Sequence, residues 1–115
     1  MKLVILITAQ TDQSLQVATA WQQAGASGVT ILEGHGLYRL QKKLEIRDDL
    51  PLMPSLTALL RGKEVDTHLL VSVVDDDLVP RLSTEATAIL GDLSLPGNGL
   101  FLSLDIADVL GLRTN

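Results

Sequence analysis

The apolar and polar positions in the first part of the chain predict a strand, a helix and a second strand. Residues 2–8 form an unbroken apolar run, which is typical of a buried strand. Apolar residues then recur at helical spacing through residue 24, and Gly25 follows as a stop signal. The apolar stripe of this helix would consist of Leu15, Ala18, Trp21 and Ala24. Residues 29–33 alternate partly between apolar and polar side chains, which favours a strand at the edge of a sheet.

The second part of the chain repeats this order of elements. Residues 65–74 predict a third strand, and residues 100–104 predict a fourth. Between them lies a predicted helix that ends at Gly91, with an apolar face of Leu82, Ala86, Ile89 and Leu90. We expect residues 105–110 to form a short turn of helix, and residues 112–114 a short terminal strand or a tail.

Polar residues precede both predicted helices. Thr11 or Asp12 can cap the first helix, because a short oxygen-bearing side chain accepts a hydrogen bond from the first-turn N–H groups. Residues 75–77 are three aspartates, which suit the positive end of the second helix, and Pro80 is tolerated in a first turn.

The two halves therefore follow one plan, with an insertion between the copies. Two right-handed βαβ units place four strands in one antiparallel sheet, with both helices on the same face. The sequence predicts an α+β protein with the ferredoxin-like βαββαβ fold.

The first, third and fourth predicted strands are apolar at nearly every position instead of at alternate positions. Two helices cover only one face of the sheet, so apolar side chains would remain on the other face. An exposed apolar patch of that size is a liability for a soluble monomer. We therefore expect an oligomer that packs through the open face, with another copy of the chain as the simplest cover.

The segment 36–64 is much longer than an ordinary loop between strands, which indicates a function or a structure of its own. Its first part, residues 37–43, carries basic side chains. Its second part predicts a short helix that begins at Pro54 or Ser55 and ends at Gly62. The apolar face of this helix would consist of Leu56, Leu59 and Leu60.

Length and composition fit a single domain over residues 1–115. The chain has no cysteine, which excludes a disulfide framework and a thiolate metal site. No apolar run is long enough to span a membrane, and the first strand lacks the features of a signal peptide, so we expect a cytoplasmic protein.

The charge of the chain is unevenly distributed. The formal net charge of −5 argues against nucleic-acid binding, which needs a basic face. The segment 36–64 nevertheless carries a net charge of +2, against −7 for the rest of the chain. A basic segment on an acidic body suits contact with an anion or a partner protein, although a solvated loop has the same composition.

A turn-rich loop, residues 91–99, leads into the last predicted strand. Gly97 and Gly99 flank Asn98, so the backbone can adopt positive φ and approach a ligand closely. Successive N–H groups of such a loop can form a nest for an anion, but a plain tight loop has the same pattern. No set of catalytic residues stands at a recognisable spacing, so we expect no enzyme, with an enzyme on the same core as an alternative.

Two histidines suggest a metal site as another alternative. His35 and His68 would lie near each other if the second and third strands are antiparallel neighbours, and Glu33 or Asp66 could then complete the site. The aspartates at 75–77 also offer carboxylates, but consecutive side chains cannot all point at one ion. We assign no metal ligands from the sequence.

Several short motifs, in this order, resemble the PII signalling proteins, the trimeric nitrogen and carbon regulators. The resemblance covers most of the chain. The matching motifs are the opening Met1-Lys2-Leu3, Ala24-Gly25 with Gly28-Val29-Thr30, Glu33 followed by Gly36, the run Val74-Asp75-Asp76-Asp77-Leu78-Val79, the loop Gly97-Asn98-Gly99, and the end Leu112-Arg113-Thr114.

The resemblance implies a homotrimer with ligand sites in the clefts between subunits, where the glycine loop cradles phosphates. It further implies that segment 37–64, the T-loop of the family, reaches a target transporter or enzyme. The ligand-binding residues carried over by the resemblance are Gly36, Arg39, Gly97, Asn98, Gly99 and Arg113. The basic part of the T-loop would supply the partner-binding residues Tyr38, Lys42, Lys43 and Arg47.

The chain departs from the family pattern at several phosphate contacts. Leu100 stands where the family usually has lysine, and Gly111 and Asp108 stand at two arginine positions. Gln41 stands one place later than the family glutamine that helps to hold magnesium-ATP and 2-oxoglutarate. Each lost charge-assisted hydrogen bond is worth roughly 1.5–3 kcal/mol, so two losses would weaken ATP affinity by roughly a few hundredfold or more.

These departures predict a divergent PII-like protein that senses a smaller or less charged ligand. Such a ligand would be a monophosphate nucleotide or a small anion, and we expect no permanently bound cofactor beyond an adenine nucleotide as a sensed ligand. Two alternatives stay open. One is a metal-binding trimer like the divalent-cation tolerance proteins, and the other is a trimer that has lost ligand binding.

Overall fold

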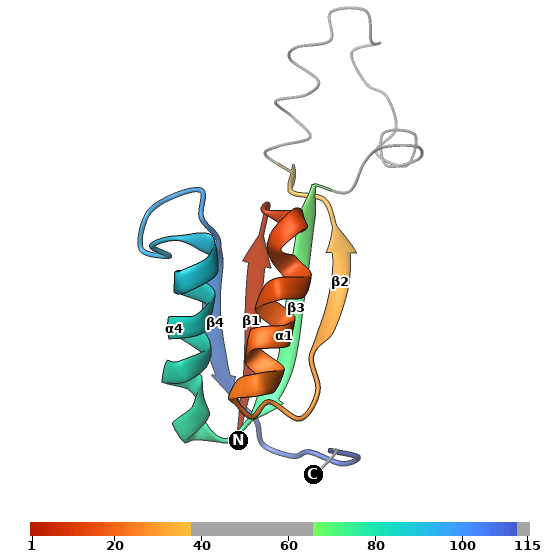
Figure 1. The fold of residues 1–115 in the computed structure, drawn as a ribbon. Coiled ribbons are helices and arrows are strands. Elements are labelled where there is room, and N and C mark those ends of the chain that lie inside the picture. The colour runs from red at the N-terminus through yellow and green to blue at the C-terminus, as the bar shows by residue number, and fades with distance from the viewer. Residues whose placement is uncertain (38–65, 113–115) are drawn as a thin grey trace, which may run out of the picture.

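The computed structural model describes residues 1–37 and 66–112, which form one four-stranded sheet and two helices (Figure 1). A short 3₁₀ turn leads into each helix. The strands are β1 (Lys2–Thr8), β2 (Thr30–Gly34), β3 (Thr67–Val74) and β4 (Leu100–Asp105); the helices are α1 (Ser14–Ala24) and α4 (Val79–Leu90); and the turns are Thr11–Gln13 and Asp76–Leu78.

The strand order is β2-β3-β1-β4, and every neighbouring pair is antiparallel. Both helices lie on the same face of the sheet (Figure 1). This is the predicted ferredoxin-like arrangement, and β2 takes the predicted edge position. All four strands and both helices lie within a few residues of their predicted bounds.

The core lies between the sheet and the two helices. Val4 and Leu6 of β1 point toward the helices and are fully buried, as is Leu70 of β3. Trp21 of α1 is also fully buried, and its ring packs edge-to-face against Phe101 with the centroids 6.2 Å apart. The indole Nε1 donates a hydrogen bond to the Leu82 carbonyl at 3.0 Å, so Trp21 fastens α1 to α4.

Alternation along the strands places a second set of aliphatic side chains on the face that the helices leave open. The register places Ile5 of β1 between Val71 of β3 and Leu102 of β4. Two further rows flank this one: Val73, Leu3 and Leu104 on one side, and Leu69, Ile7 and Leu100 on the other. We call these three rows the open face. Leu100 and Leu104 are 55% and 48% exposed, so the expected apolar second face is present.

The start of α1 differs from the prediction. Leu15, assigned to the buried stripe, is 73% exposed, whereas Ser14 is buried. Ser14 lies on the same helix face as the buried Val17 and Trp21, because residues three, four and seven apart share a face. Its Oγ forms a hydrogen bond with His68 Nδ1 at 2.7 Å there, while Leu15 points outward. Neither Thr11 nor Asp12 caps the helix, because a 3₁₀ turn precedes it and no side chain bonds its N-terminus.

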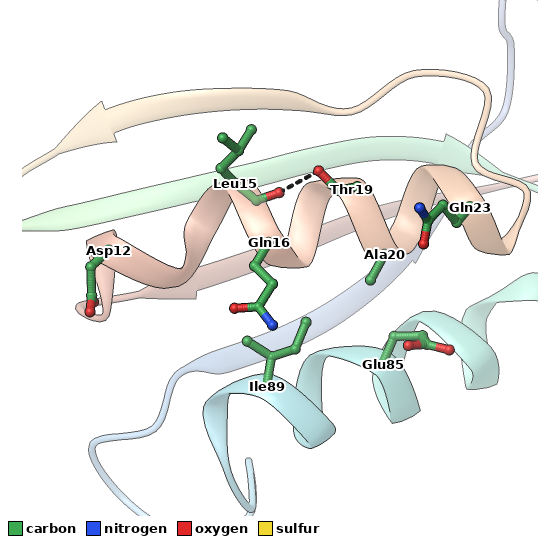
Figure 2. A pocket seen from close by; sticks show the side chains of 8 residues that line it. All are labelled: Asp12, Leu15, Gln16, Thr19, Ala20, Gln23, Glu85 and Ile89. Atoms are coloured by element: carbon green, nitrogen blue, oxygen red, sulfur yellow. Dashed lines mark hydrogen bonds between the residues drawn. The ribbon is translucent and has the colours of Figure 1, made fainter.

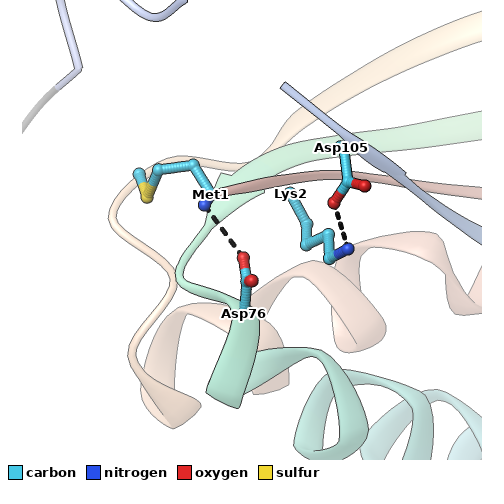
Figure 3. Close-up of polar contacts among 4 residues, drawn as sticks. All are labelled: Met1, Lys2, Asp76 and Asp105. Atoms are coloured by element: carbon cyan, nitrogen blue, oxygen red, sulfur yellow. Dashed lines mark hydrogen bonds and ion pairs between the residues drawn. The ribbon is translucent and has the colours of Figure 1, made fainter. Parts of the chain in front are cut away.

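The aspartates at 75–77 do not cap α4 through their side chains either. Instead, the carboxylate of Asp76 lies 2.9 Å from the N-terminal ammonium of Met1, and Lys2 pairs with Asp105 beside it (Figure 3). The ammonium holds the pKa of the Asp76 carboxyl below its usual range. These pairs fasten the start of β1 to the end of β3 and to β4. Pro80 lies in the first turn of α4, as predicted.

The C-terminal stretch also corrects the prediction. Residues 106–110 form no turn of helix: the chain leaves β4 in an irregular path, and the Ile106 N–H donates to the Met1 carbonyl at 3.3 Å. The few residues before Gly111 are too short a segment to repay helix nucleation. Leu112 is not in a strand, and residues 113–115 lie outside the described residues, as does the helix predicted within 54–62.

Neither described helix is long and apolar enough to cross a membrane.

Candidate functional site

The glycine loop and the two ends of the insertion lie at the same end of the sheet (Figure 1). Leu100, directly after the loop, pairs with Ile7 near the end of β1. His68, which follows the insertion closely, pairs with Thr8 at the end of β1. The last residues of β1 therefore separate the loop from the insertion.

The backbone of the loop depends on its two glycines. Gly97 has φ +93° and Gly99 has φ +140°, a region that side-chain-bearing residues rarely adopt. A Cβ at Gly99 would lie only 3.0 Å from the Ile7 carbonyl oxygen, whereas a Cβ at Gly97 would meet nothing within 4 Å. Gly99 is thus packed against β1, and Gly97 forms the open tip of the loop.

Polar side chains hold the loop from within. Asp92 Oδ1 accepts hydrogen bonds from the Ser94 N–H at 2.9 Å and from the Ser94 hydroxyl at 2.6 Å. These bonds keep the pKa of the Asp92 carboxyl below its usual range. The Asn98 side-chain amide donates to the Asp92 carbonyl at 2.8 Å. The side chain of Asn98 therefore shapes the loop, which leaves its backbone as the part that a ligand can use.

Asp66 closes the base of the insertion. Its Oδ1 accepts hydrogen bonds from the Gly36 N–H at 3.0 Å and from the Thr67 hydroxyl at 2.8 Å. Its Oδ2 lies 4.0 Å from His35 Nδ1. The backbone N–H of Gly36, which the sequence assigned to ligand binding, is thus already engaged by a carboxylate of the same chain.

Within one chain, the structure does not bring Gly36 together with the glycine loop. Gly36 follows β2, whereas the loop precedes β4, and these are the two edge strands. Neighbouring strands lie about 4.8 Å apart, so the two edges are about 14 Å apart. A small ligand that touches both sets of residues would need Gly36 from one copy and the loop from another.

The basic residues assigned to the site, and Tyr38 with them, lie outside the described residues. These are Arg39, Arg113, Tyr38, Lys42, Lys43 and Arg47. In the described ranges, the basic side chains are Lys2 and Arg81. Lys2 pairs with Asp105, and Arg81 Nε lies 3.9 Å from Glu85 Oε1. Both belong to the opposite end of the sheet from the glycine loop.

Each of the two histidines lies close to a polar side chain of the fold. β2 and β3 are antiparallel neighbours, as the metal hypothesis required, and Glu33 lies across from His68. His68 bonds Ser14, however, and His35 faces Asp66. No group of three or more histidine, aspartate or glutamate side chains in the described part of the chain could hold a metal ion.

An open groove of about 660 Å³ runs between α1 and α4, on the outer surface of the helix layer (Figure 2). The residues that line it are Asp12, Leu15, Gln16, Thr19, Ala20, Gln23, Glu85 and Ile89. Two of them carry carboxylates and none is basic, so the groove does not suit a phosphate. The backbone N–H groups of the glycine loop remain the better candidate for an anion.

No protein-family model matches this sequence, and no curated protein matches it. The fold matches solved structures at low identity. One is CPII, a nitrogen regulatory PII-like protein from Thiomonas intermedia bound to ADP, AMP and bicarbonate, with a TM-score of 0.53 and 16% identity over 91% of this chain and 88% of that chain. CPII bound to ADP and bicarbonate gives a TM-score of 0.54 and 17% identity over 91% and 84%. CutA1 from Pyrococcus horikoshii gives a TM-score of 0.58 and 15% identity over 96% and 88%.

The chain shares the fold of CPII and CutA1. Identities of 15–17% establish the architecture that CPII and CutA1 share with this chain, and they do not single out one family. The fold that the motif resemblance implies is thereby confirmed, and membership of the PII signalling family stays a prediction. The ligand, the assembly and the target are separate questions.

Sequence reasoning missed two polar residues that organise this end of the fold, Gln10 and Ser14. Gln10 bonds the end of α4 and the glycine loop, and Ser14 bonds His68. The sequence carries only a weak signal for either, because both stand among other polar residues at 10–14. Their partners are 80 and 54 residues away along the chain, respectively.

Proposed function

We propose that this chain is a PII-like signal-transduction protein, a homotrimer that senses a small ligand and regulates a partner transporter or enzyme. The ligand would be an adenine nucleotide or a small anion such as bicarbonate, bound between subunits by the glycine loop of one copy and the base of the insertion of the next. The residues of 37–64 would carry the signal. The protein would act as a regulator and not as an enzyme.

The observation that carries this proposal is the position of the two candidate ligand-binding segments. They lie at one end of the sheet but on opposite edge strands, about 14 Å apart. A single copy cannot close a small site from them. Copies packed around the open face would bring the edge of one sheet next to the edge of another.

The open face supports the same assembly. It presents three rows of aliphatic side chains and no charged residue among them. Covering such a surface is favourable by about 25 cal/mol per Å² of apolar area removed from water. Adenine nucleotides and bicarbonate are chosen as ligands because a structure with this fold, CPII, holds ADP, AMP and bicarbonate.

The test is a titration of the purified full chain with ADP, AMP and bicarbonate, each with and without the others, by calorimetry. Light scattering on the same sample gives the mass of the particle. We expect three copies per particle and at most one ligand site per cleft. Because a ligand at about a hundred times its dissociation constant adds roughly 2.7 kcal/mol of stability, binding would also raise Tm by several degrees.

Two results would contradict separate parts of the proposal. A monomer at micromolar concentration would remove the assembly, and with it the cleft. A trimer that binds none of the three ligands would leave the alternative in which the assembly persists without a sensed ligand.

A further inference from the structure

We propose that Gln10 positions the glycine loop for its ligand by joining the end of β1 to the end of α4 and to the loop. This inference rests on the proposed ligand-binding function of the loop. Gln10 is not part of the set of residues that the sequence assigned to the site. It lies between β1 and the 3₁₀ turn that begins at Thr11.

The backbone of Gln10 is fixed at both of its polar groups. Its N–H donates to Thr8 Oγ1 at 3.0 Å, and its carbonyl accepts a hydrogen bond from the Gln13 N–H at 2.9 Å. Thr8 is itself 1% exposed. The Gln10 side chain therefore leaves a turn whose backbone is held by hydrogen bonds on both sides.

The side-chain amide of Gln10 reaches two carbonyl groups of the other half of the chain. Nε2 donates to the Leu90 carbonyl at 2.9 Å and points to the Asn98 carbonyl at 3.5 Å. Leu90 is the last residue of α4, where carbonyl groups lack intrahelical partners and carry the negative end of the helix dipole. One amide group thus caps α4 and fixes the loop that follows it.

The contact with Asn98 sets the direction of the next N–H group. A trans peptide is planar, so the carbonyl of Asn98 and the N–H of Gly99 point in opposite directions. Because Gln10 draws the Asn98 carbonyl toward itself, the Gly99 N–H points away from Gln10. Gly99 lies close to β1, because a Cβ added there would come within 3.0 Å of the Ile7 carbonyl oxygen. The bond from Gln10 therefore favours one orientation of this peptide.

Three substitutions separate this role from a general effect on stability. Gln10→Glu replaces the donor with a carboxylate that faces two carbonyl groups, so it should release the loop. Gln10→Lys keeps a donor there and places a positive charge at a helix C-terminus, so it should preserve the loop. Gln22→Glu makes the same change of charge at an exposed glutamine of α1 and serves as the matched control.

The experiment measures amide hydrogen exchange across 91–99 without ligand, and then the Kd for ADP, at a temperature where every variant is folded. For Gln10→Glu we expect exchange in the loop at least about tenfold faster, and about tenfold weaker ADP binding, which corresponds to about 1.4 kcal/mol. Gln10→Lys and Gln22→Glu should stay within about twofold of the original chain in both measurements.

Each result decides a different question. Unchanged exchange in Gln10→Glu would overturn the inference, and so would a loosened loop with an unchanged Kd for ADP, because the role would then be structural only. Faster exchange across 91–99 in Gln10→Lys, equal to that in Gln10→Glu, would also overturn the inference. If the original chain binds no ADP, the proposed function fails for this ligand, and the exchange rates alone decide whether Gln10 holds the loop.

Discussion

Gly99 lies too close to the backbone of β1 to carry a side chain without a shift of the backbone. Gly99 combines positive φ with a Cβ position 3.0 Å from the Ile7 carbonyl oxygen, so an alanine there would have to move the backbone of the loop or of β1. We expect Gly99→Ala to lower the free energy of unfolding by about 1–3 kcal/mol, measured by urea denaturation.

Gly28→Ala is the matched control for this prediction. A Cβ at Gly28 would meet nothing within 4 Å, and the backbone there is not in the left-handed region. The same substitution should therefore change stability by less than about 1 kcal/mol, with a small gain from the stiffer unfolded chain. Equal effects at the two sites would show that the contact between Gly99 and Ile7 is not tight.

Asp92 should make the protein more sensitive to acid. Hydrogen bonds from Ser94 lower the pKa of its carboxyl in the folded state. A lowered pKa contributes stability that is fully present above the unfolded value, about pH 4, and is lost as the pH falls through the folded value. We expect the Tm to fall between about pH 5 and pH 3. In Asp92→Asn, which keeps an acceptor oxygen but has no titrating group, that fall should be smaller.

Asp108→Asn makes the same substitution at an exposed carboxylate outside the loop and controls for a simple change of net charge. A pH dependence of Tm that is the same in Asp92→Asn and in the original chain would contradict the role of the bonds from Ser94.

Individual residues were the hardest part of this fold to predict from the sequence. Helical spacing gave the helix of residues 14–24 but assigned Leu15 to the core and left Ser14 out. The buried face of α1 runs through Ser14, Val17, Ala18 and Trp21 instead. Ser14 is satisfied on that face by a hydrogen bond to His68, a residue 54 positions away. Periodicity predicts a helix more reliably than the exact edge of its buried face, because a polar residue can lie on that face when a distant partner satisfies it.

The elements, in contrast, follow from local patterns. The apolar run at 2–8, the glycines at 25 and 91 and the alternation at 29–33 marked strands and helix ends that the structure confirms. The candidate site was predictable only in part. The glycine loop has a local sequence signal, whereas its supports at Gln10 and Ile7 depend on tertiary contacts. The charged residues assigned to the site stay predictions, because they lie outside the described residues.

The middle row of the open face gives a test at the level of elements. Ile5 lies between Val71 and Leu102, at the centre of the apolar rows. Burying an unpaired ammonium costs several kcal/mol, so Ile5→Lys should separate the copies while leaving the opposite, helix-covered core intact. We expect the light-scattering mass to fall from a trimer to a monomer, with an unchanged circular dichroism spectrum.

Thr19→Lys adds the same charge at an exposed position of α1 and should stay a trimer. If Ile5→Lys fails to fold, Val71→Lys on the neighbouring strand repeats the test. A trimer that tolerates lysine at both positions would place the contact between copies somewhere other than the open face.

For the molecule as a whole, charge is distributed unevenly between an acidic body and a basic segment at 36–64. The body is acidic, and the two basic side chains in its described part are paired with carboxylates. In the proposed site, affinity for an anion would come from backbone N–H groups of the glycine loop and from Arg39 and Arg113. This is the physical reason to expect a weakly charged ligand such as AMP or bicarbonate in preference to a triphosphate.

The open face has a consequence for how the folding of the protein depends on its concentration. When the two helices have packed against the sheet, only one of its two apolar faces is buried. If its copies complete the burial for one another, folding of the last part is a reaction of higher order, and its extent depends on how many chains are present. A newly synthesised chain would then keep its open face exposed to water until it binds other copies. The fraction of chains in the native state would therefore rise with the concentration of the protein.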